Sequence, residues 1–268
     1  MGSATRESVS AAIAVLTAQS SFDLATGQQL LSASQIVEGS SHLRAALADD
    51  AAEADDRVSI VRALFGKYTK PAQAVLESLA SGRWSSADDL VGAIELLGIR
   101  AVAASAPASV SIKSLTINDE LFAFLTAVTS NADLELALGG KLGSSESRVA
   151  VVNRLLAGKA SAHTLAIVTA LIAQPRGRRI AELIRSASAI VAEQSGSTIA
   201  TVTIAAALTP AQRARLEKSL SSQYGGSMRI NEVVDQSILG GMRVHIGDEI
   251  IDGTIANRIT DLRLRLAS

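Results

Sequence analysis

The first hundred residues place apolar side chains three and four positions apart. Val9 and Leu16 lie on one stripe near the start, and Val58 and Val61 lie on a stripe further along. Apolar residues at this spacing occupy one face of an α-helix, with polar residues on the other. The pattern recurs often enough to predict a six-helix-type bundle over residues 1–100.

A second helical region, residues 115–195, repeats the first. Leu43 and Leu47 correspond to Leu134 and Leu138 at a constant offset. Further matched positions keep this order: Arg57, Val58, Val61, Leu64 and Phe65 with Arg148, Val149, Val152, Leu155 and Leu156. A constant offset across loops and helices predicts an internal duplication. The second copy lacks a full equivalent of the first helix.

Residues 101–114 separate the two regions. Ala, Ser and Val dominate this segment, and Pro107 lies in its middle. This composition favours an irregular connection, so the segment is predicted to be a linker.

The spacing changes to two in the last part of the chain. Thr198–Ile204 is rich in β-branched residues, and Met242, Val244 and Ile246 alternate with polar residues. Both patterns are typical of strands. Thr209 starts a helix between them, with proline at the next position. Residues 196–268 are therefore predicted to form a small α/β domain, a β-α-β-β-α unit.

Composition narrows the classes of function. The formal net charge of −1 provides no basic field for nucleic acid, and Cys 0 excludes a disulfide framework or thiolate chemistry. The most apolar segment, Leu165–Ala173, is far shorter than the roughly 18 residues that indicate a membrane span. Met1–Ser10 lacks the apolar core of a signal peptide. We expect a soluble cytoplasmic protein without direct membrane insertion.

No motif in the sequence carries catalytic chemistry. Gly66-Lys67 and Gly158-Lys159 lack the remaining residues of a phosphate-binding loop. The histidines lie in different segments, so we predict no metal, no cofactor and no catalytic residue; they are His42, His163 and His245. The basic run 176–179 is interpreted as a solvated helix start, with binding of a partner's acidic segment as the alternative.

The residues from Val234 onward resemble a known family. The carrying positions are Val234-Asp235, Ile238-Leu239-Gly240-Gly241, Val244, Ile246-Gly247-Asp248 and Ile251-Asp252-Gly253-Thr254. In this order they resemble the C-terminal signature of the ATP synthase delta subunit, or oligomycin-sensitivity-conferring protein, family. Gln236 departs from the family, where proline is common. The duplication is similar to the actinobacterial type, in which an extra helical unit is inserted before the C-terminal domain.

This resemblance implies a non-catalytic stator role in a proton-translocating ATP synthase. The helical domain of the family grips the N-terminal helices of the alpha subunits, and the C-terminal domain meets b-type stalk helices. The resemblance therefore places the protein peripherally, at the cytoplasmic face of the plasma membrane. Partner-binding candidates lie in the first and fifth helices and in the C-terminal domain, with core filling as the alternative for each: Ile13, Leu16, Leu76, Leu79, Leu239, Met242 and Val244. The role of the duplicated unit as a second grip, a spacer or a brace is left open.

Two other classes of protein fit parts of the sequence. A generic helical adaptor would explain the bundles but not the C-terminal signature. A small-molecule enzyme built on the α/β domain would explain the glycines, but it would also require convergent polar groups.

Overall fold

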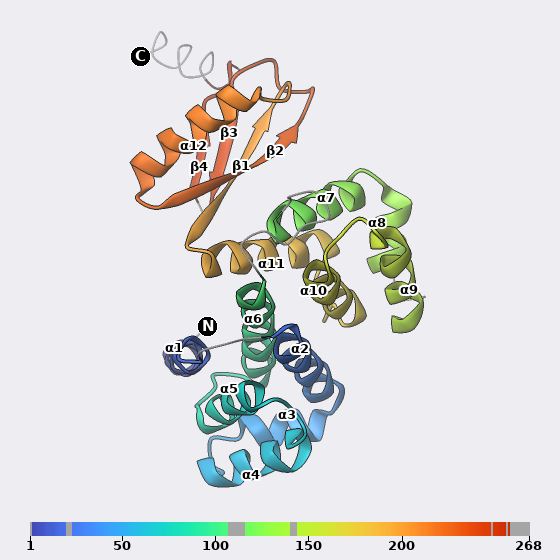
Figure 1. Ribbon diagram of the computed structural model, residues 1–268, viewed down its shortest axis with the longest axis vertical. Coiled ribbons are helices and arrows are strands. Elements are labelled where there is room, and N and C mark those ends of the chain that lie inside the picture. The colour runs from blue at the N-terminus through green and yellow to red at the C-terminus, as the bar shows by residue number, and fades with distance from the viewer. Residues whose placement is uncertain are drawn as a thin grey trace, which may run out of the picture. The chain divides into compact units, whose positions relative to one another are not determined.

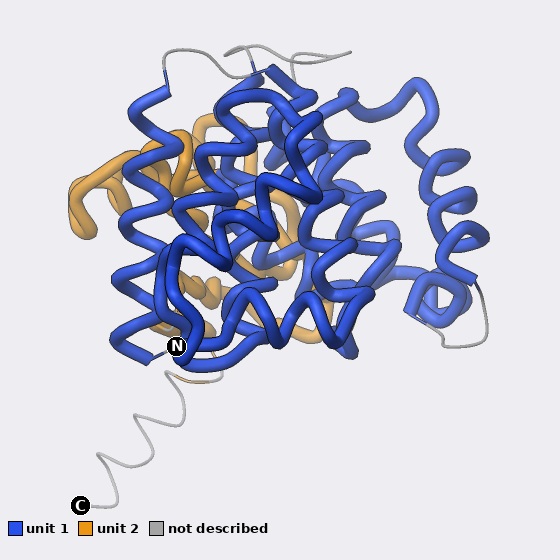
Figure 2. The backbone as a smooth tube through the Cα atoms, turned by 90° about the horizontal axis from the view of Figure 1, so that it is seen from below, with its two compact units in different colours: residues 1–191 blue, residues 192–268 orange. Residues whose placement is uncertain are grey.

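The structure is a computed structural model, and it falls into two compact units, residues 1–191 and 192–268 (Figure 2). The described residues are 2–19, 23–106, 116–139, 144–247, 249–255 and 257. The first unit is helical and the second contains the sheet (Figure 1). This confirms the predicted fold class, mainly α with a small C-terminal α/β domain.

The helical unit contains two copies of one arrangement of helices. The first copy consists of α1 (Ser3–Thr17), α2 (Leu24–Gly39), α3 (Ser41–Ala48), α4 (Ala54–Phe65), α5 (Lys70–Ser81) and α6 (Ala87–Ser105). The second consists of α7 (Ile117–Thr129), α8 (Ala132–Gly139), α9 (Ser145–Leu156), α10 (Ala162–Ala173) and α11 (Ile180–Gln194). Helices α3 and α8 both have 8 residues, α4 and α9 both have 12, and α5 and α10 both have 12. Within the described residues, α1 has no counterpart in the second copy.

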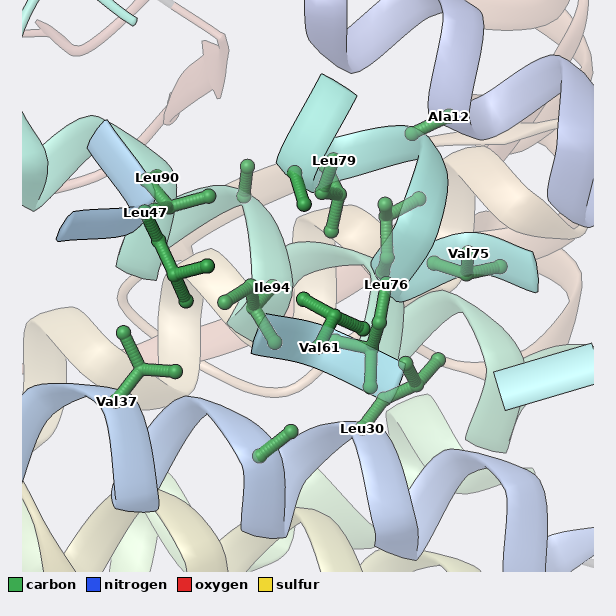
Figure 3. Close-up of a cluster of buried hydrophobic side chains, with 14 of the residues drawn as sticks. Ala12, Leu30, Val37, Leu47, Val61, Val75, Leu76, Leu79, Leu90 and Ile94 are labelled. Atoms are coloured by element: carbon green, nitrogen blue, oxygen red, sulfur yellow. The ribbon is translucent and has the colours of Figure 1, made fainter. Parts of the chain in front are cut away.

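Equivalent positions fill the cores of the two copies. In the first copy, apolar side chains from α2, α4, α5 and α6 converge (Figure 3). The five positions of α5 that are buried recur in the same order on α10: Ala72, Val75, Leu76, Leu79 and Ala80 match Thr164, Ile167, Val168, Leu171 and Ile172. The duplication seen in the sequence is therefore also a duplication of packing.

The boundary predicted at residue 100 is wrong, because α6 continues to Ser105. Ala101 and Val102 are fully buried within this helix, and their small apolar side chains were interpreted as linker composition. Ile99 and Val102 pack into the core of the second copy, together with Leu31 of α2. The two copies therefore share side chains. The rest of the predicted linker, from Pro107 onward, lies outside the described residues, and the four-part domain division remains a prediction.

The sheet unit contains four strands in the order β2-β1-β3-β4. They are β1 (Ser197–Ile204), β2 (Ser227–Val234), β3 (Met242–Ile246) and β4 (Glu249–Asp252). β1 pairs in parallel with β2 and antiparallel with β3, and β3 forms a hairpin with β4. Helix α12 (Pro210–Tyr224) connects β1 to β2 and packs its Leu216 and Leu220 onto the sheet. The closing helix predicted around Ile255–Leu266 lies almost wholly outside the described residues.

Both ends of α12 form as its sequence predicts. Thr209 and Gln212 exchange hydrogen bonds in a capping box, and Pro210 occupies the first helical position. The helix ends at Gly225, whose φ of 67° is favourable for glycine.

Candidate partner-binding site

Four of the seven predicted partner-binding residues have their side chains in a core. Leu16, Leu76 and Leu79 are at most 3% exposed in the helical unit, and Val244 is 4% exposed in the sheet unit. Ile13 packs partly buried against the first core. In this structure these side chains fill or border a core. Core filling is the alternative that the sequence left open for each of them. Their contact with a partner stays a prediction.

A groove lies between α1 and α5, the two helices that the resemblance indicated. Its volume is about 540 Å³. Most of its walls are small side chains, with one acidic and one basic residue among them: Ser3, Ala4, Glu7, Ser8, Ala11, Ser78, Ser81, Gly82 and Arg83. We call it the α1–α5 groove. The small side chains on both walls leave room for a ligand to approach the backbones of α1 and α5 closely.

The large apolar residues predicted on α1 and α5 and the residues that line the groove lie on different faces of these helices. Leu16, Leu76 and Leu79 fill the core. The groove is lined instead by Ala4, Ser8 and Ala11, which recur at helical spacing along α1. That spacing was visible in the sequence. Alanine and serine are so frequent throughout this chain that the stripe did not stand out.

Hydrogen bonds fix α1 beside the end of α5. The Ser8 hydroxyl donates to the Arg83 carbonyl at 2.8 Å and accepts from the Arg83 amide at 3.0 Å. Thr5 donates to an Asp89 carboxylate oxygen at 3.0 Å. Gly82 makes the close approach possible, because a Cβ atom there would lie 2.6 Å from the Ser8 Oγ atom. The groove therefore has a preformed wall.

The exposed apolar residues of the sheet unit gather after β2 and around the hairpin. Leu239 is 82% exposed, which is far more than Met242 or Val244, the other predicted contacts in this unit. The other large exposed residues of this unit are Val233, Val234, Ile250 and Ile255. Leu239 is the most exposed of the seven predicted residues, so it is the one most accessible to a partner.

Gly240 and Gly241 turn the chain from this loop into β3. Both have positive φ, and a Cβ atom at Gly241 would lie 2.4 Å from the Gly253 carbonyl oxygen. Only glycine fits there. On the neighbouring strand, hydrogen bonds from Thr254 and then from Arg243 hold the pKa of Asp252 below its ordinary value, so its carboxylate stays charged. This carboxylate secures the hairpin beside Leu239.

The basic run 176–179 pairs within the helical unit. Arg178 binds Glu95 of α6 through two hydrogen bonds of 2.8 Å, and Arg176 approaches the same carboxylate at 3.3 Å. The Glu95 side chain is only 13% exposed. Two of the arginines therefore join the second copy to the first, and the interpretation as a solvated helix start is wrong for them.

No group of three or more His, Asp or Glu side chains within the described ranges is arranged to hold a metal ion. Likewise, no single helix there is both long and apolar enough to cross a membrane. Only α7 and α8 taken together meet that test, and the chain bends by 105° between them.

The described fold is a repeated helical bundle followed by a small α/β unit. The chain belongs to the ATP synthase delta (OSCP) subunit family, whose model matches residues 101–266. Members of this family are non-catalytic components of the peripheral stalk of the synthase. Membership decides against the generic adaptor and against the small-molecule enzyme.

Curated relatives match along the whole chain. The chain is 48% identical to ATP synthase subunit delta of Leifsonia xyli subsp. xyli, over 100% of both proteins. It is 36% identical to the subunit of Streptomyces avermitilis, over 99% of this chain and 98% of the relative. A solved structure of the Toxoplasma gondii mitochondrial ATP synthase hexamer contains a similar chain, at TM-score 0.39 and 15% identity, covering 65% of this chain and 97% of that one. The family assignment depends on the sequence matches alone.

The family model and the curated relatives cover different parts of the chain. The relative from Leifsonia xyli matches it over its full length. The family model begins at residue 101, so it includes the second copy and the sheet unit and leaves residues 1–100 outside. The first copy is therefore the part of this chain that lies beyond the family match.

Proposed function

We propose that this subunit tethers the catalytic head of a proton-translocating ATP synthase to its b-type stalk helices, at the cytoplasmic face of the plasma membrane. The helical unit holds the N-terminal helix of an alpha subunit in the α1–α5 groove. The sheet unit meets the b-type helices through the surface around Leu239. The tether prevents the head from turning with the rotor.

The α1–α5 groove is the observation that carries the first contact. In the described residues, only the first copy places a first helix beside its fifth, and these are the two helices that the resemblance indicated, so the proposal uses the groove of this copy. Because the α1 wall is already held in place, binding would order few further residues. The entropic cost of binding is therefore small, which favours high affinity.

The experiment is affinity purification of the whole synthase from native membranes, using the full-length tagged subunit. A tryptophan at Ala11, which is exposed and lines the groove, should fill it without disturbing the core. We expect Ala11→Trp to lose the alpha and beta chains and to keep the b-type chains. Ala63→Trp is the matched control, since Ala63 is exposed on α4 away from the groove. Full recovery of the head with Ala11→Trp would contradict the groove assignment.

The second contact has its own variant. Leu239→Asp should lose the b-type chains and keep the head, because a charge would replace the most exposed leucine. Leu64→Asp is the control, at a leucine that is 52% exposed on α4. Equal recovery of b-type chains with both variants would show that Leu239 does not contact the stalk.

A further inference from the structure

We propose that Glu7 and Arg83 set the direction in which a helix lies in the α1–α5 groove. This inference rests on the proposed function of the groove. The ligand is then an amphipathic helix whose contact stripe carries a basic residue opposite Glu7 and an acidic residue opposite Arg83.

The charges of the groove support this assignment. Among the described residues, Glu7 and Arg83 are the charged residues that line the groove, and they have opposite signs. Glu7 lies on α1, while Arg83 lies two residues beyond the end of α5, so the charges stand on different walls. Both residues are exposed, and neither side chain forms an ion pair with any described residue. Complementary charges across an interface fix its register and reject reversed partners.

The uncharged lining determines how close the ligand comes. Ala4, Ala11, Ser78 and Ser81 carry no side chain larger than a hydroxymethyl group. A helix can therefore lie with its backbone near both walls. At that range its flanking side chains reach Glu7 and Arg83 directly, and partial exclusion of water strengthens the attraction between the charges.

In the second copy, a helix of the same chain packs on the equivalent face of the fifth helix, α10. Ala170 and Ala173 of α10 are the counterparts of Ser78 and Ser81, and α2 lies against them. The Gln35 amide of α2 donates to the Ala170 carbonyl at 3.0 Å. The residues of α2 that line the cavity beside α10 have the spacing of one helical face: Gln28, Leu31, Ser32 and Gln35. This internal example indicates that the fifth helix of the repeat accepts an amphipathic helix.

The position of Arg83 is fixed before any ligand arrives. Its backbone amide and carbonyl are both bonded to the Ser8 hydroxyl of α1, the helix that carries Glu7. The backbones of the two charged residues are thus held close together by direct bonds between the walls. Opposite charges held on different walls can discriminate between the two directions of a helix.

The test measures binding of a synthetic peptide, the N-terminal segment of the alpha subunit from the same complex, to the full-length chain by fluorescence anisotropy. Glu7→Gln and Arg83→Gln should each weaken binding about five-fold, as expected for a partly exposed ion pair. Binding should also become less sensitive to salt. The exchange Glu7→Arg with Arg83→Glu should weaken it further, and a peptide with its flanking charges exchanged should recover the loss. Asp50→Asn and Lys67→Gln, at exposed positions outside the groove, should leave binding unchanged.

Three outcomes would overturn parts of this picture separately. If Ala11→Trp abolishes peptide binding but Glu7→Gln and Arg83→Gln act like their controls, the charge assignment is wrong and the groove stands. If Asp50→Asn and Lys67→Gln weaken binding as much, the effect is one of overall charge and the assignment is again wrong. If the peptide binds Ala11→Trp as well as the unmodified chain, or does not bind at all, the proposed function of the groove fails.

Discussion

In the first copy of the repeat, α2 approaches α6 closely at Gly27, whereas the equivalent position of the second copy carries a hydrogen-bonding side chain. A Cβ atom at Gly27 would lie 2.4 Å from the Val102 Cγ2 atom. A second contact of α2 with α6 is a hydrogen bond from the Ser34 hydroxyl to the Val91 carbonyl at 3.4 Å. The counterpart of Gly27 is Asn118, whose buried amide oxygen accepts a hydrogen bond of 3.0 Å from Ser188 of α11. The two copies therefore preserve one arrangement of helices while the chemistry that holds it has changed.

The start of the fifth helix differs in the same way. In the first copy the Gln29 side chain accepts from the Thr69 amide at 2.8 Å. In the second copy, Glu120 takes this role and accepts from the Ser161 amide and hydroxyl and from the Thr164 hydroxyl. Glu120 is 4% exposed. The first copy thus has a neutral acceptor at this position, and the second copy has a buried charged one. The charged contact contributes more to the free energy of unfolding, and its loss costs more.

Removing Glu120 or Gln29 should give the largest difference in stability between the two copies. Glu120→Ala leaves several buried donors without an acceptor, so we expect a loss of about 3 kcal/mol in the free energy of unfolding. Gln29→Ala removes one acceptor and should cost about 1 kcal/mol. Urea unfolding of the full chain measures both.

Glu120→Gln serves as the matched control, because an amide oxygen can still accept from the Ser161 amide. It should cost less than Glu120→Ala. Equal losses for Glu120→Ala and Gln29→Ala would mean that the charged cap contributes no more than the neutral one.

The glycine contact comes second. Gly27→Ala should lower the free energy of unfolding by about 2 kcal/mol, because the new methyl group would overlap Val102, including its backbone nitrogen at 2.7 Å. Gly39→Ala is the control, since it lies at the end of the same helix with no other atom within 4 Å. It should be neutral or slightly stabilising. Similar effects of the two substitutions would show that α2 and α6 can separate without cost.

The third largest loss of stability is expected at the ion pairs that join the two copies. Glu95→Gln leaves Arg176 and Arg178 without their anion and should cost about 1.5 kcal/mol, given their partial burial. Glu77→Gln removes the ion pair with the more exposed Arg62 inside the first copy and should cost at most about 0.5 kcal/mol. Thermal unfolding at low and high salt would compare them. A larger loss of stability for Glu77→Gln than for Glu95→Gln would contradict this prediction.

The smallest effect concerns pH. His163 takes the place in α10 that Pro71 takes in α5. Burial lowers the pKa of His163 below its ordinary value of 6.5, against opposing effects of the Ser105 backbone and of Glu120. The unfolded chain therefore binds this proton more readily, and the stability present above pH 6.5 declines as the pH falls through that value towards the folded pKa.

His163→Pro transplants the residue of the first copy, and the first turn of a helix accepts proline. We expect its urea midpoint to fall less than that of the unmodified chain between pH 7.5 and about pH 5.5. Other titrating groups are common to both proteins, so the difference isolates His163. Parallel profiles would show that the imidazole is equally easy to protonate in the folded state.

The sequence predicted the elements of this fold better than its surfaces. Helical spacing and the offset between Leu47 and Leu138 were enough to identify both copies, because core positions follow directly from periodicity. The continuation of α6 through Val102 was missed, since alanine and valine suit both a linker and a helix that is buried on all sides. Periodicity identifies a buried face but does not show what covers it.

For the same reason, the candidate site was only half predicted. Leu76 and Leu79 have the apolar character of a contact surface, yet the first core covers them. The small residues that line the groove, such as Ala11 and Ser78, carry no signal of their own. The pairing of Arg178 with Glu95 joins residues far apart in the chain, and only the three-dimensional packing brings them together.

The 19 residues of α6 give it a length of about 28 Å. Its first turns lie in the core of the first copy, and Ile99 and Val102 lie in the core of the second. Bending the pair of copies against each other would require this rod to leave one of the two cores, which costs far more than rotating a loop. The helical unit therefore resists bending under a sideways load. Elastic deformation of the complex then occurs outside this unit.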